Sequence, residues 1–294
     1  MRIGCHCSMS APDYVLGSVK EALSYNANAL MIYTGAPQNS ARRNINELKI
    51  EEANKFLADN NLNPSDVVIH APYIINLANT FKVETYELGV KLLINEINRS
   101  IAIGSKILVL HPGSHVGASI DTGINSIIKG IDSAIASIPL IGDFKIALET
   151  MSGKGTEVGF TFEQLKKIIE GSSYTDNLGV CMDSCHLSDA GYDITNINKL
   201  LDEFESYIPL NKILCFHIND SKNPNGSKKD RHANIGYGTI GFQPLSDIVN
   251  CERLKDVIKI LETPYIDGQA PYAYEIKMLK ENKFNDKLIE ELTK

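Results

Sequence analysis

Histidines and carboxylates stand at the ends of short apolar runs in this sequence. Seven of eight such runs close with a side chain that can titrate or bind a metal, namely His6, His70, His111, Glu149, Asp183, His217 and Glu262. Strand ends that simply meet solvent would be expected to carry serine, asparagine, glycine or lysine. The pattern therefore predicts that most of these residues act together at one site.

Two further clusters lie just beyond apolar runs. His186 follows Asp183 by three residues, and Asp230 and His232 form an Asp-x-His pair in the long segment after the seventh run. Imidazole and carboxylate groups suit zinc, manganese or iron without any thiolate. Nine such ligands exceed the four to six that one ion takes, so we predict two or three ions held by His70, His111, Glu149, Asp183, His186, His217, Asp230, His232 and Glu262.

Four of the six cysteines, Cys5, Cys7, Cys181 and Cys215, are interpreted as packing residues rather than as ligands. The six stand at positions 5, 7, 181, 185, 215 and 251 without a C-x-x-C pair, which argues against a zinc ribbon or a thioredoxin-like site. Side chains alternate along a strand. Cys181 and Cys215 should therefore lie beneath Asp183 and His217, whereas Cys5 and Cys7 should point the opposite way from His6. Free cysteine usually behaves as a small buried apolar residue.

The elements that must position these side chains alternate between strands and helices. Continuous apolar runs are typical of parallel strands buried on both faces, and amphipathic segments separate them. The predicted strands are Arg2–Cys7, Ala29–Thr34, Asp66–His70, Lys106–His111, Lys145–Glu149, Leu178–Asp183, Ile213–His217 and Val257–Glu262. The predicted helices are Val15–Tyr25, Ile50–Asp59, Tyr86–Ile101, Ile124–Ile138, Phe162–Glu170, Ile197–Tyr207, Phe242–Asn250 and Ala273–Leu292.

Eight strand–helix units predict an α/β fold, a (β/α)8 TIM barrel that forms a single domain over residues 1–294. A doubly wound sheet is the alternative. In a barrel the carboxyl ends of all strands meet at one mouth, where active sites of this fold lie. The loop-like stretches Gly35–Arg43, Gly113–Gly123 and Asn219–Thr239 each follow a strand and would surround that mouth.

Composition restricts the class of protein. The chain has 294 residues, of which 43% are hydrophobic and 22% charged, so a large core is available and disorder is excluded. No run reaches the roughly 18 apolar residues of a membrane span, and the first residues lack a signal-peptide stretch, so we expect a cytoplasmic protein. The net charge of −7 argues at first against a nucleic-acid partner, because phosphate binding usually needs a basic surface.

Clustered divalent ions favour phosphodiester hydrolysis. A pair of ions activates water near neutral pH and clamps the attacking and leaving oxygens in line. A third ion can neutralise the leaving alkoxide. Three divalent ions would also change the formal charge from −7 to −1, so that the acidic balance describes the chain without metal. We expect weak attraction to undamaged duplex and binding concentrated at the metal-lined mouth.

The sequence resembles the endonuclease IV family of zinc-dependent apurinic/apyrimidinic endonucleases over essentially its whole length. The H-P-G-S-H segment at His111–His115 and the D-x-C-H segment at Asp183–His186 are the most specific features. The other matching segments are Ile3–Ser8, Ala147–Thr150, Gly179–Met182, Phe216–Asp220, Asp230–His232 and Ile260–Pro264.

This resemblance implies three zinc ions. His70, His111 and Glu149 would hold the first, and Glu149 would bridge to a second ion completed by Asp183, His217 and Glu262. The third would be held by His186, Asp230 and His232. Manganese would also satisfy one or more of these positions.

The implied reaction is hydrolysis 5′ to an abasic site, with Glu149 as the bridging ligand that positions the hydroxide. It would leave a 3′-hydroxyl and a 5′-deoxyribose phosphate. Trimming of blocked 3′ ends is a further implied activity. The expected partner is double-stranded DNA with abasic sites or blocked 3′ ends, no membrane is involved, and we expect a monomer.

The resemblance also implies residues that contact DNA. An abasic nucleotide flips out of the duplex easily because no pairing is lost, and Tyr73 matches the family's inserting tyrosine. In the loop at 34–43, Gln38 and either Arg42 or Arg43 look like the family's duplex-inserting and phosphate-contacting residues. This loop departs from the family's pattern, and the chain has no tryptophan, so which residue fills the gap left by the flipped nucleotide stays open. Further candidates for phosphate contact are His6, Asn76, His115, Lys228, Lys229 and Arg231.

Two other functions fit part of the pattern. Glu149, Asp183, His217 and Glu262 alone would serve a single-metal sugar isomerase or epimerase on the same barrel, but the remaining ligands would then have no role. A non-catalytic DNA-binding or metal-buffering barrel is disfavoured because every ligand position of the matching motifs is present.

Overall fold

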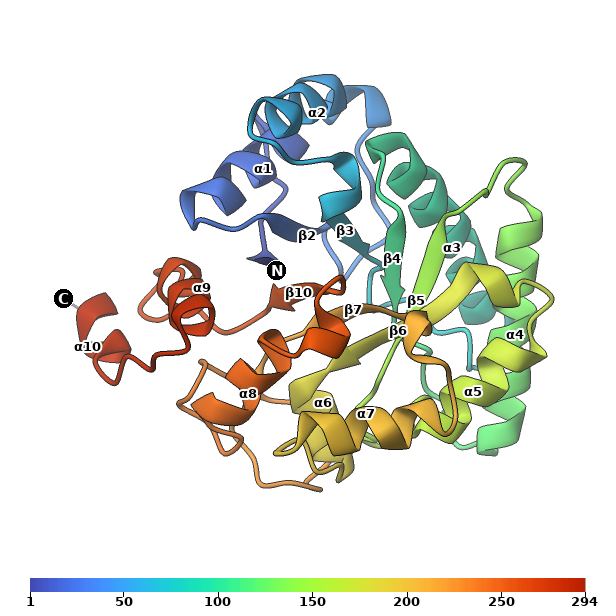
Figure 1. The fold of residues 1–294 in the computed structure, drawn as a ribbon. Coiled ribbons are helices and arrows are strands. Elements are labelled where there is room, and N and C mark those ends of the chain that lie inside the picture. The colour runs from blue at the N-terminus through green and yellow to red at the C-terminus, as the bar shows by residue number, and fades with distance from the viewer. Residues whose placement is uncertain (294) are drawn as a thin grey trace.

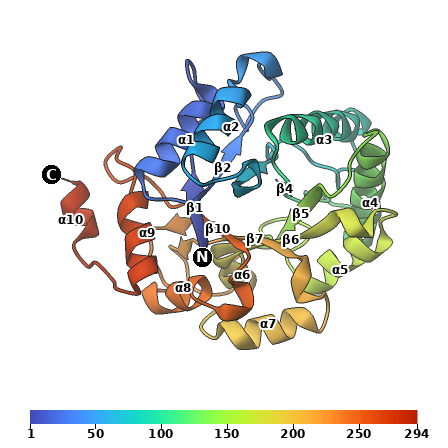
Figure 2. The same ribbon diagram turned by 45° about the horizontal axis from the view of Figure 1, so that its top comes forward.

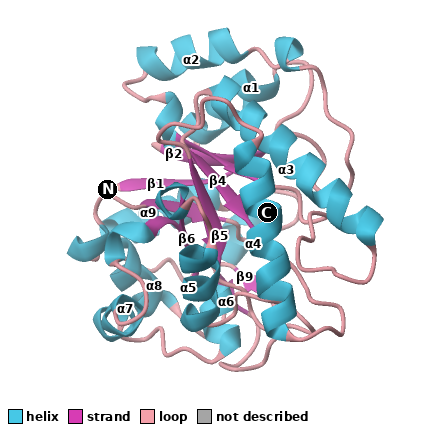
Figure 3. Ribbon diagram, turned by 90° about the vertical axis from the view of Figure 1, so that its right-hand side faces the viewer, coloured by secondary structure: helices cyan, strands magenta, loops and turns pink. Residues whose placement is uncertain are grey.

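The computed structural model describes residues 1–293, which form one closed barrel of eight parallel strands. Neighbouring strands around the barrel follow the order β1-β10-β7-β6-β5-β4-β3-β2, and β2 returns to β1. The helices lie outside the strands (Figures 1, 2 and 3). The strands are β1 Arg2–His6, β2 Ala29–Tyr33, β3 Val67–His70, β4 Ile107–Leu110, β5 Lys145–Glu149, β6 Leu178–Asp183, β7 Ile213–His217 and β10 Ile258–Leu261. The predicted (β/α)8 barrel is confirmed, and the doubly wound alternative is wrong because the sheet closes on itself.

The outer layer consists mainly of the predicted helices. They are α1 Tyr14–Ser24, α2 Ile50–Asp59, α3 Val83–Ile103, α4 Ile120–Ala136, α5 Phe162–Gly171, α7 Ile197–Glu205, α8 Phe242–Val249 and α9 Tyr272–Glu281. The predicted helix Ala273–Leu292 is wrong as a single element. Asn282 takes a left-handed conformation, with φ 49°, which ends α9, and the chain then forms the short α10 Leu288–Leu292.

A short helix, α6 Ser184–Ala190, was not predicted. It begins directly at the end of β6, where the Asp183 side chain accepts a hydrogen bond from the His186 backbone N–H at 2.7 Å. Asp183 is thus the N-cap of α6, which satisfies one of the free amide groups of the first turn. The three-residue spacing of Asp183 and His186 is thus the spacing between an N-cap side chain and the backbone N–H that it accepts from.

The barrel interior is a separate apolar layer under the mouth. Its members come from alternate positions of the strands, and they are Ala29, Met31, Val68, Val109, Ala147, Cys181, Cys215, Ile258 and Ile260. On six strands, the residue two places further along is one of the predicted ligands. Because side chains alternate along a strand, each of these ligands lies on the same face as the apolar residue, one layer higher. Cys5 and Cys7 belong instead to the core between barrel and helices. The predicted orientation of all four cysteines is confirmed.

The connection after β7 is long and closely organised. It contains a two-stranded antiparallel pair, β8 Asp220–Ser221 and β9 His232–Ala233. The buried Asp220 carboxylate accepts backbone hydrogen bonds from Ser221 and from four residues between Gly236 and Gly241. In the described part of the chain, no helix is long and apolar enough to cross a bilayer.

Candidate metal centre

Glu149 lies at the middle of the site, at the end of β5, and its two carboxylate oxygens face different histidines. Its Oε2 lies 3.1 Å from His70 Nε2 and 3.0 Å from His111 Nε2. Its Oε1 lies 3.1 Å from His217 Nδ1 and 3.4 Å from His186 Nδ1. The side chain is buried, so solvent does not screen its contacts with the histidines. A carboxylate placed in this way can share its oxygens between two cations.

The nine predicted ligands form three overlapping groups. Within each group the ligand atoms lie within 4.8 Å of one another, and the groups are His70–His111–Glu149, Glu149–Asp183–His217–Glu262 and Asp183–His186–His232. Asp230 completes the third group, with its Oδ1 3.1 Å from His186 Nε2 and 3.6 Å from His232 Nε2. The structure thus brings all nine residues together. It also places Asp183 between the second and third groups.

The chemistry of this donor set fits divalent cations. Among the residues that the structure describes, no lysine or arginine pairs with Glu149, Asp183, Asp230 or Glu262, whose only charged partners are histidines. The Nε2 atom of His232 is buried and has no hydrogen-bond partner in the same part of the chain, although it faces Asp183 and Asp230. A cation with nitrogen and oxygen ligands would satisfy this atom and compensate the carboxylates.

Protons take the place of cations when the site holds no metal. Burial alone would raise the pKa of Glu149, but His217 and His111 hold it well below its usual range. Burial alone would also raise the pKa of Asp230, but the bond to His186 lowers it to about 2. Conversely, burial would lower the pKa of His186, but Asp183, Asp230 and Glu149 raise it well above its usual value. The His186 imidazole therefore holds a proton more tightly than a free imidazole does, and an ion that binds there must displace it.

Backbone groups orient the ligand imidazoles. His70 Nδ1 donates to the Ala71 carbonyl at 2.7 Å, and His186 Nδ1 donates to the Thr150 carbonyl at 2.9 Å. These bonds set the tautomer and direct each Nε2 lone pair into the site. Because Ala71 and Thr150 each follow a barrel strand directly, the strand ends themselves fix the ring orientation.

Asn219 is a functional residue that sequence reasoning missed. Its side-chain Nδ2 donates to Asp183 Oδ2 at 2.7 Å, and its Oδ1 accepts the Glu262 backbone N–H at 2.9 Å. Asn219 therefore ties two ligand-bearing strand ends to the end of β7. The signal was its place in the Phe216–Asp220 segment, two residues after His217.

Tyr73 lies beside two of the predicted ligands, His111 and Asp230. The residue is 53% exposed, and it lines a hollow of about 370 Å³ together with His111, Ser114 and Asp230. Lys154 lines the same hollow and was not predicted, because its Gly-Lys-Gly surroundings contain no distinguishing pattern. An exposed aromatic ring and a cation thus border the metal ligands.

Other predicted DNA contacts differ in how freely they could reach a partner. His6 is half-buried against Tyr33, which packs on His70, and burial lowers the pKa of His6. Asn76 holds the 113–115 turn by bonds to both backbone groups of Ser114. Lys228 lies over the Phe160 ring at 5.5 Å. His115 is half-buried, whereas Gln38, Arg43, Lys229 and Arg231 are exposed.

Arg42 occupies a different place from the one predicted. Its side chain is 4% exposed, and its Nε donates to the fully buried Glu96 at 2.6 Å. Its Nη1 donates to backbone carbonyls of the same loop, including those of Asn39 and Ala41. Its Nη2 has no hydrogen-bond partner among the described residues, but this atom is also buried, so a phosphate could reach it only if the loop moved. We therefore assign Arg42 to the support of the loop at 34–43 rather than to DNA.

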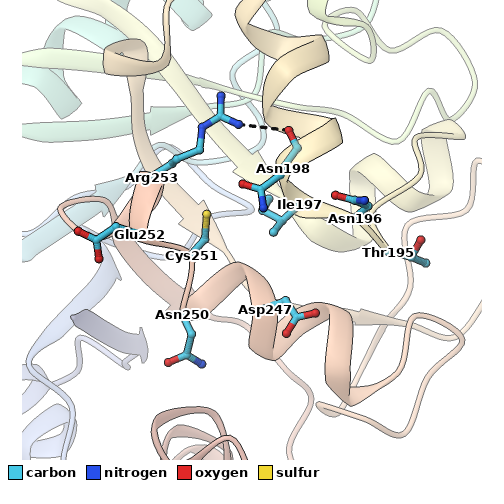
Figure 4. A pocket seen from close by; sticks show the side chains of 9 residues that line it. All are labelled: Thr195, Asn196, Ile197, Asn198, Asp247, Asn250, Cys251, Glu252 and Arg253. Carbon is cyan, nitrogen blue, oxygen red and sulfur yellow. Dashed lines mark hydrogen bonds between the residues drawn. The ribbon is translucent and has the colours of Figure 1, made fainter.

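A larger hollow lies elsewhere, between α7 and α8 (Figure 4). It measures about 550 Å³ and is lined by residues 195–198, Asp247 and residues 250–253, none of them a predicted ligand. Arg253 bridges its sides by donating to the Asn198 carbonyl. None of the groups of metal-ligating side chains found among the described residues includes a residue of this lining, which sets the hollow apart from the barrel mouth.

The fold and the donor set define a class of protein, the metal-binding TIM barrels related to xylose isomerase. A model of the family described as "xylose isomerase-like TIM barrel" matches residues 19–282, and the chain belongs to that family. It is 49% identical to a protein named probable endonuclease 4 from Geobacillus kaustophilus, over 99% of this chain and 98% of that one. A protein of the same name from Bacillus subtilis is 48% identical over 99% of both chains. The chain is therefore a member of the endonuclease IV family, a family of nucleases.

Solved structures agree with this placement. The crystal structure of endonuclease IV from Thermus thermophilus superposes with a TM-score of 0.84 at 28% identity, covering 99% of this chain and all of that one. A D-tagatose 3-epimerase-like protein superposes with a TM-score of 0.68 over the full length of both chains, but at 19% identity this likeness concerns the fold alone.

Proposed function

We propose that this protein is a DNA-repair endonuclease that hydrolyses the phosphodiester bond 5′ to abasic sites. The products would be a 3′-hydroxyl and a 5′-deoxyribose phosphate, and blocked 3′ ends would be trimmed at the same site. Three zinc ions would be bound, with manganese able to replace zinc at one or more positions. The protein would act as a monomer.

One observation supports this proposal above all: eight ligands form three groups that overlap through Glu149 and Asp183, and Asp230 joins the third group as the ninth ligand. A single ion would use four to six of them, so the surplus favours a multinuclear centre. Bound divalent ions would supply Lewis-acid stabilisation of phosphate charge and activation of water near neutral pH. Glu149 would be shared by two ions, because its Oε2 faces His70 and His111, whereas its Oε1 faces His217 of the second group.

The surroundings of the ligands support a flipped nucleotide as the substrate. Tyr73 is exposed at the rim, and the hollow of about 370 Å³ beside it reaches His111 and Asp230. An aromatic side chain can stack in place of a lost base, and an abasic nucleotide gives up no base pairing when it leaves the duplex. Lys154 would add positive charge beside the displaced backbone.

The same geometry disfavours the sugar isomerase. Glu149, Asp183, His217 and Glu262 form a single-metal quartet, but His70, His111, His186, Asp230 and His232 would then surround no ion. In a one-metal enzyme the buried His232 Nε2, which has no hydrogen-bond partner among the described residues, would also have no ion to bind.

The test uses a duplex with one tetrahydrofuran abasic analogue. This analogue cannot undergo β-elimination, so cleavage on its 5′ side would separate hydrolysis from lyase chemistry. The wild-type protein should incise it and leave an extendable 3′-hydroxyl, and Glu149→Ala should lose incision because two ion sites lose a shared ligand. Glu163→Ala, on the outer helix α5, is the matched control and should retain full activity.

Elemental analysis decides the metal part of the proposal. Close to three ions per chain, mostly zinc, are expected. One manganese or magnesium per chain together with an intact tetrahydrofuran duplex would favour the isomerase and refute the nuclease.

A further inference from the structure

Asp189 is a fully buried carboxylate that belongs to none of the ligand groups. It lies on α6, three residues after the ligand His186, so both side chains lie on neighbouring positions of one helical surface. A buried carboxylate needs hydrogen-bond donors to offset its desolvation. The source of those donors shows what Asp189 does.

Four donors reach the Asp189 side chain, all from the connection between β7 and α8. The hydroxyls of Ser221 and Ser227 donate to Oδ1 at 3.0 and 3.2 Å. The backbone N–H groups of Lys229 and Asp230 donate to Oδ2 at 3.2 and 2.6 Å. The Asp189 carbonyl accepts a further bond from the Lys228 N–H at 3.0 Å. One residue therefore binds every backbone amide from 228 to 230.

The bound segment is held in an unfavourable backbone conformation. Lys228 and Asp230 both have φ 55°, in the left-handed region that side chains other than glycine rarely adopt. Such residues cost about 1 kcal/mol or more each and persist only where the surroundings hold them. The shortest of the four bonds is made to the amide of Asp230 itself, the residue that presents Oδ1 to His186 Nε2 at 3.1 Å.

We propose that Asp189 is a positioning residue that builds the third ion site. Helix α6 presents the ligand His186 and, one turn later, the carboxylate that holds the second ligand, Asp230, opposite it. Removing this carboxylate leaves all nine ligands in the chain but lets Asp230 swing away from His186. The inference rests on the proposed function, because it assumes an ion between these residues.

The decisive experiment compares stepwise zinc affinities of Asp189→Asn and the wild type. Asparagine has the same shape but keeps only one acceptor oxygen, so it cannot bind both the serine hydroxyls and the two amides. Loss of support behind a ligand typically weakens metal binding 10- to 100-fold. Competition with a chromophoric chelator should show the third ion bound about 10- to 100-fold more weakly, with the first two ions unchanged. Cobalt substitution provides a spectroscopic count of the occupied sites.

A matched control separates this role from general stabilisation. Asp132 on α4 accepts similar bonds, from the Ser172 hydroxyl at 2.5 Å and the Ser173 amide at 3.0 Å, in a loop without ligands. Asp132→Asn should lower stability and leave all three zinc affinities unchanged. Excess zinc should restore incision by Asp189→Asn, because its ligands are intact, whereas Asp230→Ala should not recover at the same zinc concentration.

The possible outcomes are distinct. A folded Asp189→Asn protein that binds its third ion as tightly as the wild type would overturn the proposal. If that variant does not fold, Ser227→Ala decides, because it removes a single donor: a weaker third site supports the role of Asp189, and an unchanged one refutes it. A wild-type protein with fewer than three ions would instead refute the trinuclear proposal.

Discussion

Replacing Arg42 by alanine should destabilise the protein, whereas replacing its neighbour Arg43 should not. The Arg42 side chain is 4% exposed and pairs with Glu96, which is 0% exposed, at 2.6 Å. The Arg43 side chain is 67% exposed, and its partner Glu47 lies 3.8 Å away. The two adjacent arginines thus share a loop and a charge but differ in burial, which makes them a matched pair.

The magnitude follows from the group left behind in each variant. Removing one partner of a buried ion pair typically costs about 3–5 kcal/mol. Glu96 would keep the bond from the Thr34 hydroxyl at 2.6 Å, so we expect the lower end, about 3 kcal/mol. For a protein of this size that corresponds to a fall in Tm of roughly 6 °C or more. The exposed Arg43 pair is worth less than about 1 kcal/mol.

The two variants should differ in opposite ways in calorimetry and in DNA binding. Arg42→Ala should lower Tm and, below its unfolding temperature, leave the salt dependence of binding to an abasic-site duplex unchanged. Arg43→Ala should leave Tm within about 2 °C of the wild type. If Arg43 contacts a phosphate, the slope of log affinity against log salt should fall by about 1. An Arg42→Ala protein as stable as the wild type would refute the assignment of Arg42 to the interior.

Two other outcomes concern pH. Glu275 is buried and accepts bonds from Thr263, Asn234 and the Ile235 amide, and burial raises its pKa to about 7. Because the folded protein binds this proton more tightly, the protonated Glu275 stabilises the fold fully below the unfolded pKa of 4.5. This stabilisation, about 3 kcal/mol, is lost as pH rises through the folded pKa of about 7. In urea unfolding, the free energy of unfolding of Glu275→Gln should therefore rise relative to that of the wild type between pH 5 and pH 8. If the free energies of the two proteins change in parallel with pH, Glu275 does not titrate in this range. Metal binding should also depend on pH. Burial alone would lower the pKa of His186 and His217, but their neighbours raise both pKa values well above the usual value. Protein stripped of metal with a chelator should therefore release protons when it takes up zinc, and it should bind zinc more tightly as pH rises. Equal zinc affinity at pH 6 and pH 8 would contradict this.

The positions of the strands and of most ligands were predictable from the sequence because both depend on local periodicity. All eight strands were predicted to within a residue or so, and alternation along each strand placed Cys181 below Asp183 and Cys215 below His217 correctly. The Asp183–His186 spacing was also visible, although α6 itself was missed, because a seven-residue helix is too short to show an amphipathic pattern.

What the sequence by itself determined is thus which side chains reach the mouth of the barrel. Tertiary structure alone decided how they share it: that the two oxygens of Glu149 face different histidines, that Arg42 turns inward to Glu96, and that Asp189 holds Asp230 from 41 residues away. Period and spacing describe neighbours along the chain, whereas these contacts join segments that meet only when the barrel closes and the loops pack above it.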